Sequence, residues 1–187
     1  NTASLLNQQQ FTAQWNDDWH NVMHVLLTGE QEGYYSDFVD NATPRLARCL
    51  SEGFIFQGHT SRHGHSRGEP SAHLPPTAFV AFLQNHDQTG NRALGERLSM
   101  LADADSLAAA EVLLLLSPMI PLLFMGEEWG STRPFLFFTE HNEELAQAVR
   151  EGRRAEFADF SAFFDEKSRE RIPDPNALTT FEASIPD

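Results

Sequence analysis

The polar segment Asn85-His86-Asp87-Gln88 closely follows an apolar run at residues 78–83. Apolar, aromatic and β-branched residues in a run of this length are typical of a strand that is covered on both faces. Polar side chains at the carboxyl end of such a strand predict a site at one edge of a parallel sheet, as in βα-barrels. There, the His86 imidazole and the Asp87 carboxylate could hydrogen-bond neighbouring hydroxyls of one sugar ring. The alternative is a turn that caps a helix, because Asp is a favourable N-cap residue.

A second cluster, at residues 15–20, alternates aromatic with hydrogen-bonding side chains. Sugars are bound by stacking on aromatic faces, while carboxylates and amides take the hydroxyls. Asn16, Asp17 and His20 are therefore candidate ligand-binding residues. A capped helix with two core tryptophans explains the same residues equally well.

Two further groups are weaker signals. Glu127 and Glu128 could be a catalytic pair, but adjacent residues rarely face one target, so we expect one of them to support a site structurally. Four histidines lie within or beside a loop at residues 58–76, namely His59, His63, His65 and His73. Their spacing is a weak metal signal, since no carboxylate or cysteine stands at ligand spacing, and a mobile polar loop is favoured. Neither a metal nor another cofactor is expected.

The elements that must position these residues alternate along the chain. Apolar patterning predicts strands at 11–15, 78–83 and 122–125. A helix at 19–27 follows the first strand, helices at 94–101 and 106–116 follow the second, and a helix at 143–157 follows the third. This order predicts an α/β fold with a parallel sheet and crossover helices. Expected helix signals are caps at Asp17 or Asp18 and in the Asp105-Ser106 region, and a stop at Gly29. A further helix is expected at 44–50 (before Gly53), the helix at 143–157 is expected to have a solvated face at 151–156, and an exposed linker is expected at 173–175.

Composition restricts the partners. The formal net charge of −14 argues against binding to a phosphate backbone, which requires Lys and Arg, so no nucleic acid is expected. The apolar stretch at 112–125 is too short for a membrane span, and Pro118 and Pro121 interrupt it. The first residues carry no basic region of a signal peptide, and Cys49 is the single cysteine. A cytoplasmic protein with a neutral ligand is therefore expected.

Residues 82–91 resemble the fourth signature region of the α-amylase family of glycoside hydrolases. The resemblance implies that His86 grips the sugar ring that is cleaved. It also implies that Asp87 is the catalytic residue that stabilises an oxocarbenium-like transition state. Asn16, Asp17, His20 and Gln88 are implied to contact substrate.

Within that family the chain resembles the maltooligosyltrehalose trehalohydrolases. The matching blocks occur in order at 14–20, 54–58, 74–76, 82–93, 121–130, 138–141, 143–157 and 174–181. The implied reaction is hydrolysis of the α-1,4 bond that joins trehalose to a maltooligosaccharide, and the implied partner is maltooligosyltrehalose or a related α-glucan. A branching enzyme or amylase relative, and a non-catalytic carbohydrate-binding domain, remain alternatives.

The resemblance also implies that part of the enzyme lies outside this chain. A (β/α)8 barrel needs about 200 residues or more, and a retaining glycosidase needs a nucleophile and an acid/base about 5–5.5 Å apart. In the family these two residues end the fourth and fifth strands. We expect residues 1–172 to be the C-terminal part of a (β/α)8 TIM barrel, roughly strands six to eight with their helices, and 173–187 to be a linker. Such a fragment is expected to be inactive alone and to self-associate through exposed barrel edges.

Overall fold

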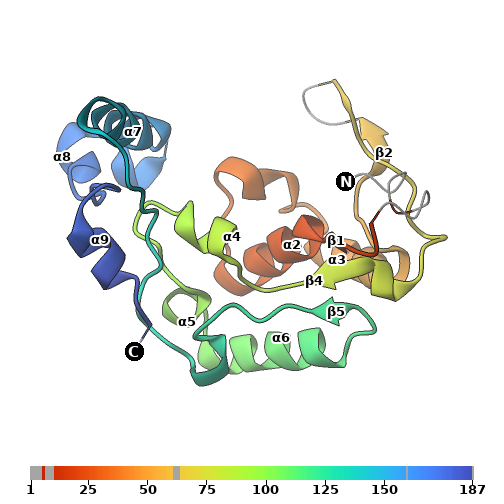
Figure 1. Cartoon of the computed structure of the whole chain (residues 1–187). Coiled ribbons are helices and arrows are strands. Elements are labelled where there is room, and N and C mark those ends of the chain that lie inside the picture. The colour runs from red at the N-terminus through yellow and green to blue at the C-terminus, as the bar shows by residue number, and fades with distance from the viewer. Residues whose placement is uncertain (1–5, 7–10, 61–63, 159, 187) are drawn as a thin grey trace. The chain divides into compact units, whose positions relative to one another are not determined.

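The computed structural model describes residue 6 and residues 11–60, 64–158 and 160–186 (Figure 1). Its chain divides into two compact units. Unit 1 comprises Asn1–Leu83 and Ala102–Leu123, and unit 2 comprises Gln84–Leu101 and Phe124–Asp187.

Unit 1 contains a parallel sheet with the strand order β1-β4-β5. These strands are β1 (Gln14–Trp15), β4 (Phe79–Ala81) and β5 (Ile120–Pro121). Val80 at the centre pairs with Trp15 on one side and with Ile120 on the other. The expected α/β class and parallel pairing are confirmed. The strands are shorter than expected, and the prediction of a third strand at 122–125 is wrong in position, because β5 lies just before that segment and does not overlap it. Strand β5 ends at Pro121 because that residue pairs with Ala81, the last residue of β4.

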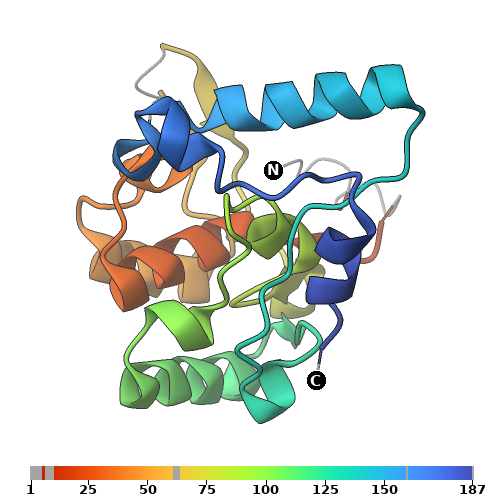
Figure 2. The same cartoon turned by 90° about the vertical axis from the view of Figure 1, so that its left-hand side faces the viewer.

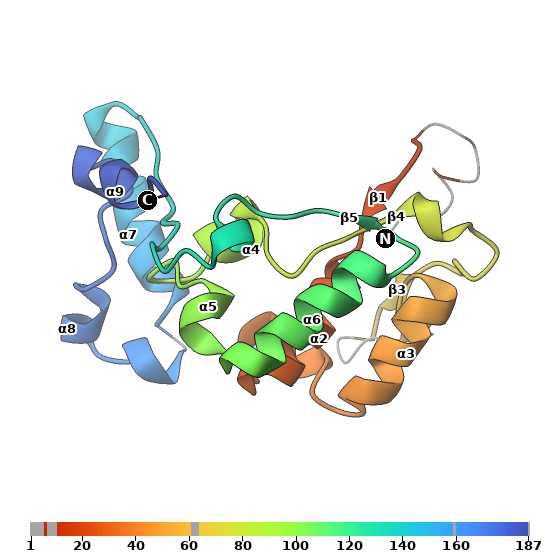
Figure 3. The same cartoon turned by 90° about the horizontal axis from the view of Figure 1, so that it is seen from below.

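Helices pack around this sheet within unit 1. They are α2 (Asp17–Thr28), α3 (Ala42–Glu52) and α6 (Ala104–Leu116), with 3-10 turns η1 (Gly33–Asp37) and η2 (Pro76–Ala78). Helix α2 contacts α3, α6 and β4, and its neighbours are visible from below in Figure 3. The core contains fully buried aromatic rings, and Phe54 meets Phe79 edge-to-face at 5.0 Å.

The helix boundaries of unit 1 follow their caps. Helix α2 begins after Asn16, whose side chain accepts from the Trp19 N–H, and ends at Gly29, which has a left-handed φ of 72°. The predicted stop is confirmed, but the predicted cap at Asp17 or Asp18 is wrong because Asn16 already occupies the junction with β1. Likewise, Asp103 caps α6, two residues before the predicted cap region.

The predicted loop at 58–76 contains a β-hairpin. Strand β2 (Gln57–Thr60) pairs antiparallel with β3 (Ser66–Gly68). Arg67 anchors the hairpin, because its guanidinium lies 4.0 Å from the Phe56 ring centroid and its Nη1 lies 2.8 Å from Asp37 Oδ2. His63 lies outside the described residues. Composition alone missed this hairpin, whose strands carry few of the apolar residues that signal a buried strand.

Unit 2 contains short helices around a small apolar core. Its elements are α4 (His86–Gly90), α5 (Leu98–Leu101), η3 (Glu127–Trp129), α7 (Glu143–Glu156), η4 (Ser161–Phe163), α8 (Glu166–Arg169) and α9 (Leu178–Ala183). The core joins Ala93, Phe157, Phe163 and Ile172. Of the predicted helix at 94–101, only the last turn is helical, and it forms α5.

Helix α7, seen along its length in Figure 2, confirms the prediction at 143–157. Its solvated face was predicted wrongly at one position: Arg153 is only 7% exposed. The expected exposed linker is also packed, since Arg150 pairs with Asp174, the Thr139 N–H donates to Pro175 O, and Pro175 is buried. Within the described residues, no helix combines the length and the apolar character needed to cross a membrane.

Candidate active site

The segment at 85–88 forms the start of helix α4 in unit 2. Asn85 is 2% exposed, and its Oδ1 accepts from the Gln88 N–H at 2.7 Å. Its carbonyl oxygen accepts from the Thr89 N–H at 3.0 Å. The helix cap that was the alternative to a sugar site therefore exists, but Asn85 makes it. Asp87 is not used as the cap.

His86 and Asp87 are exposed, and Gln88 is half-buried. Asp87 Oδ1 accepts from Asn91 Nδ2 at 2.8 Å, and Asp87 O accepts from the Asn91 N–H at 3.0 Å. An exposed carboxylate held by one amide keeps acceptor capacity for a ligand, because an ionised carboxylate offers about four lone-pair sites. The structure brings these three candidates together on one short helix.

The buried side chain of Gln84 fixes the chain just before this motif. Gln84 Oε1 accepts from the Leu98 N–H at 2.8 Å, and its Nε2 donates to Glu127 Oε1 at 3.0 Å. The other oxygen of Glu127 accepts from the Phe124 N–H. Glu127 therefore has a structural role, because its carboxylate ties residue 84 to the start of the 124–127 turn. That this role supports a functional site stays a prediction.

Asn16, Asp17 and His20 lie together in unit 1 at the junction of β1 and α2. Asn16 is 0% exposed. Its Nδ2 donates to Gly53 O at 2.9 Å and contacts Cys49 Sγ at 3.3 Å, while its Oδ1 caps α2. The buried amide thus joins β1, α2 and the end of α3. Burial also raises the pKa of the Cys49 thiol, so this thiol stays protonated.

The two aspartates that follow have opposite surroundings. Asp17 is exposed in the first turn of α2. Asp18 is 2% exposed, and its Oδ2 accepts from the N–H groups of Ile55 at 2.9 Å and Phe56 at 3.2 Å. Burial raises the pKa of Asp18, and the backbone donors and Arg67 oppose the increase. Asp17 therefore faces solvent, and Asp18 anchors the segment before the hairpin.

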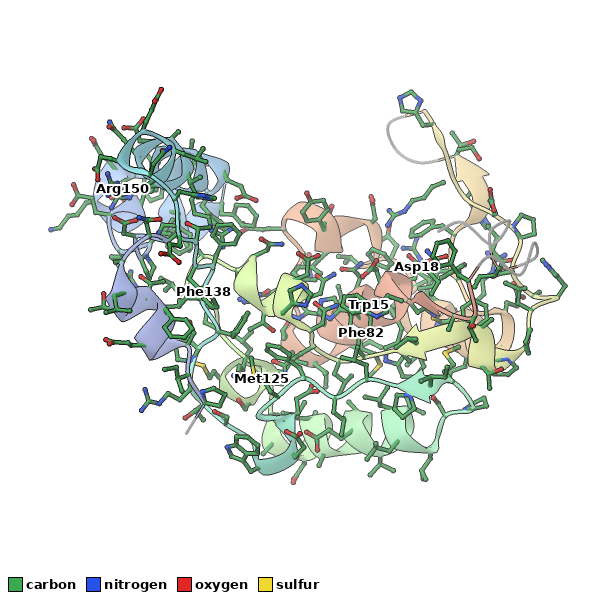
Figure 4. All side chains as sticks on the ribbon, in the orientation of Figure 1. Trp15, Asp18, Phe82, Met125, Phe138 and Arg150 are labelled. Carbon is green, nitrogen blue, oxygen red and sulfur yellow. The ribbon has the colours of Figure 1, made fainter. Side chains whose placement is uncertain are left out.

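His20 is buried, with 3% of its surface exposed. Its Nδ1 lies 2.6 Å from Leu83 O, so Nδ1 carries the proton and donates, because a carbonyl only accepts. Its ring stacks on Phe82 at 5.9 Å, and Trp15 meets the same Phe82 edge-to-face at 5.6 Å; Trp15 and Phe82 are labelled in Figure 4. His20 thus links α2 to Leu83, two residues after the end of β4.

Sequence reasoning missed Arg153 and Asn91. Arg153 lies within a run of charges, yet its spacing from Ala146 and Phe157 places it on the buried stripe of α7. That spacing was a usable signal. For Asn91 the signal was its position four residues after Asp87, which is one helical turn.

The described histidines, cysteine and acidic residues do not form a group of three or more that could hold a metal ion. His59, in the hairpin, instead contacts protein: its Nε2 lies 3.0 Å from Arg48 Nη1, and its Nδ1 accepts from the Gln57 N–H.

Comparison with known proteins finds relatives along almost the whole of this chain. The chain is 43% identical over 184 residues to a malto-oligosyltrehalose trehalohydrolase of Deinococcus radiodurans, covering 97% of this chain and 30% of the relative. A protein of the same name from Saccharolobus solfataricus is 45% identical over 150 residues, covering 77% of this chain and 26% of that protein. This chain therefore spans about 30% or less of the length of these relatives.

A solved structure is also similar to this chain over nearly its whole length. The crystal structure of a Salmonella typhimurium protein, provisionally assigned as an alpha amylase, matches with a TM-score of 0.87 and 54% identity. The match covers 95% of this chain and 29% of that one. No family model matches the chain.

Proposed function

Because this chain belongs to the family of the malto-oligosyltrehalose trehalohydrolases over the part that it spans, we propose that it supplies part of the active site of a glycoside hydrolase. The reaction is hydrolysis of the α-1,4 bond that joins trehalose to a maltooligosaccharide. The observation that carries the proposal is the exposure of His86 and Asp87 at the start of α4, while Gln84 and Asn85 beneath them are buried.

The exposed residues take the chemical roles. The Asp87 carboxylate stabilises the positive charge that develops on the sugar ring in an oxocarbenium-like transition state. His86 and Gln88 hold hydroxyls of the ring, because imidazole and amide side chains carry hydrogen-bond donors and acceptors. Asp17, exposed at the start of α2, contacts a further hydroxyl of the substrate.

We also propose that Asn16 and His20 contact the substrate, but their burial restricts how they can do so. Both side chains are buried, and their hydrogen bonds described above join them to protein atoms. Direct contact with a sugar requires their surroundings to open. Substituting Asp17 is therefore expected to affect substrate binding with less effect on folding than substituting either neighbour.

The nucleophile and the acid/base of a retaining mechanism are proposed to come from outside this chain. Support comes from the relatives, which are about three times as long, and from the parallel order β1-β4-β5. We assign these strands to positions six to eight of a (β/α)8 barrel. The purified 187-residue chain should then release no trehalose from maltooligosyltrehalose. Turnover by this chain alone would refute the assignment.

An amylase or branching-enzyme relative is the second candidate, favoured by the 54% identity to the Salmonella typhimurium protein. Product analysis on the complete enzyme separates the two. With maltooligosyltrehalose as substrate, a trehalohydrolase releases free trehalose, whereas an amylase cuts within the maltooligosaccharide. Trehalose as the main first product supports the proposal, and its absence favours the second candidate.

A non-catalytic carbohydrate-binding role is the third candidate. Trp129 is 56% exposed and Trp15 is 39% exposed, so both indoles can stack on sugar rings. Quenching of tryptophan fluorescence by maltooligosaccharides, without hydrolysis by the complete protein, would favour this role over the enzyme.

Exposed apolar side chains support the proposal that the chain self-associates. Leu116 of α6 is 80% exposed, and Val112 and Leu115 are more than half exposed. Strands β1 and β5 lie at the two edges of their sheet. Light scattering should therefore show dimers or larger species, and a monodisperse monomer would contradict this expectation. We also place the protein in a reducing compartment such as the cytoplasm, since its single cysteine is a buried free thiol.

A further inference from the structure

Arg153 of α7 holds the turn that follows α4. Its Nη2 donates to Gly90 O at 2.8 Å and to Arg92 O at 2.9 Å. Gly90 is the last residue of α4, and a helix leaves its final carbonyls without donors from its own backbone. One buried guanidinium therefore supplies donors to two carbonyls at the end of the Asp87-bearing helix.

The guanidinium is itself fixed in place. Its central carbon lies 4.8 Å from the centroid of the Phe137 ring and 5.0 Å from that of Phe157. Its Nη1 lies 3.3 Å from Glu156 Oε2. Burial lowers the pKa of Arg153 and Glu156 opposes the decrease, but an arginine stays charged in a protein. A lysine could not reproduce the planar contacts with both rings and the two carbonyls.

Asn91 connects this anchor to the candidate catalytic carboxylate. It lies between Gly90 and Arg92, the two residues whose carbonyls Arg153 binds. Its side-chain amide donates to Asp87 Oδ1, and its backbone N–H donates to Asp87 O. Fixing the chain on both sides of Asn91 therefore fixes the amide that orients the Asp87 carboxylate.

We propose that Arg153 is a positioning residue for Asp87, acting through Asn91. Arg153 touches no substrate and holds the geometry in which Asn91 aims one oxygen of Asp87, leaving the rest of the carboxylate for the sugar. The inference rests on the proposed function only for the consequence in catalysis. A displacement of about 1 Å in a reacting group lowers turnover by roughly 10²-fold, so a modest shift of α4 is enough to be measured.

The first test uses the purified chain and does not depend on activity. Replacing Arg153→Met should speed hydrogen exchange at the Thr89 and Asn91 amides by about 10-fold or more, because both close α4. Exchange in α2 of unit 1 should not change. Arg154→Met, one position along the same helix, is the matched control and should leave α4 unaffected. Equal exchange in α4 for Arg153→Met and the control would overturn the proposal.

The second test uses the complete enzyme. Arg153→Met and Asn91→Leu should each lower kcat by roughly 10- to 100-fold and leave KM within about twofold, since the lost interaction acts on the transition state. Arg153→Lys, which keeps the charge and is the milder change, should fail to restore kcat. A purely structural role would instead reduce the fraction of folded enzyme and leave kcat per folded molecule unchanged, which would overturn the proposal.

The two tests separate the two claims. If the wild-type enzyme releases no trehalose, the proposed function fails. The exchange measurement still decides whether Arg153 holds the helix that carries Asp87. If the wild type is active and Arg153→Met matches Arg154→Met in kcat, the positioning role fails and the proposed function stands.

Discussion

Asn91 Nδ2 donates to Asp87 Oδ1 at 2.8 Å, within one turn of the same short helix. Asp87 is exposed, whereas the supports of that helix, Asn85 and Arg153, are buried. The arrangement separates two tasks. Exposed residues are available to a ligand, and buried residues determine where the exposed ones point. Reactive groups that are held by rigid, packed neighbours keep a productive geometry without reorganising during the reaction.

Substitution of two glycines tests how closely the chain packs against the Phe79 ring of β4 in unit 1. Gly53 has a φ of 88°, and a Cβ at this position would lie 2.1–2.6 Å from atoms of the buried Phe79 ring. Gly53→Ala should lower the free energy of unfolding by about 3 kcal/mol or more, combining backbone strain with overpacking. Gly29→Ala, at a φ of 72° with open space around it, should lower it by only about 1 kcal/mol. Urea denaturation of the purified chain measures both, and equal losses would contradict the packing described.

The Glu127-Glu128 pair offers a matched test of the support in unit 2. Glu127 accepts from N–H donors through both carboxylate oxygens, so Glu127→Gln turns one acceptor into a donor that faces Gln84 or the Phe124 N–H. We expect a loss of about 1–3 kcal/mol in the free energy of unfolding. Glu128 accepts from the Gly126 N–H through one oxygen, which a glutamine can replace. Glu128→Gln should therefore cost less than about 1 kcal/mol. A larger loss for Glu128→Gln would be the contrary result.

Asp18 should give the stability a measurable pH dependence. Burial raises the pKa of Asp18 in the folded chain above its ordinary value of 3.8. The folded chain therefore binds the proton more tightly than the unfolded chain does. The stability from protonated Asp18 is complete below pH 3.8 and is lost as the pH rises through the higher folded-state pKa. Asp18→Asn should thus gain in melting temperature relative to wild type as the pH rises from about 4 to 8.

Asp105→Asn, at an exposed position in the first turn of α6, is the control and should show no such trend. A wild-type minus Asp18→Asn difference that stays constant with pH would mean that Asp18 titrates normally in the folded chain.

The sequence predicted the parts of the fold that depend on local patterns. The helices at α2, α3 and α7 were expected because their apolar spacing and their stop signals, such as Gly29 and Gly53, lie within the segments themselves. The parallel strand order followed from the alternation of strands and helices. The hairpin β2–β3 was missed because its strands carry few apolar residues, and a contact from its own Arg67 to the Phe56 ring holds it in place.

The sequence names the residues of the candidate site, but it does not report their surroundings. The types and positions of His86 and Asp87 are visible in the sequence, since they follow an apolar strand. Burial of Asn16 and His20 depends on residues far along the chain, such as Gly53 and Leu83, and no local pattern reports it. Arg153 was assigned to a solvated face because the charges around it outweighed its spacing from Ala146 and Phe157 on the buried stripe of α7. Its partners, Gly90 and Arg92, lie more than 60 positions away.

The central claim is that Asp87 stabilises the transition state of a glycoside hydrolase. The most direct measurement is kcat for trehalose release from maltooligosyltrehalose by the complete enzyme carrying Asp87→Asn, with Asp105→Asn as the matched control. The substitution keeps the size of the side chain and an oxygen acceptor for Asn91 Nδ2, so the fold should persist. We expect kcat to fall by roughly 10²- to 10³-fold or more with an unchanged circular dichroism spectrum, while the control keeps wild-type turnover. A kcat for Asp87→Asn within a few fold of wild type would contradict the account.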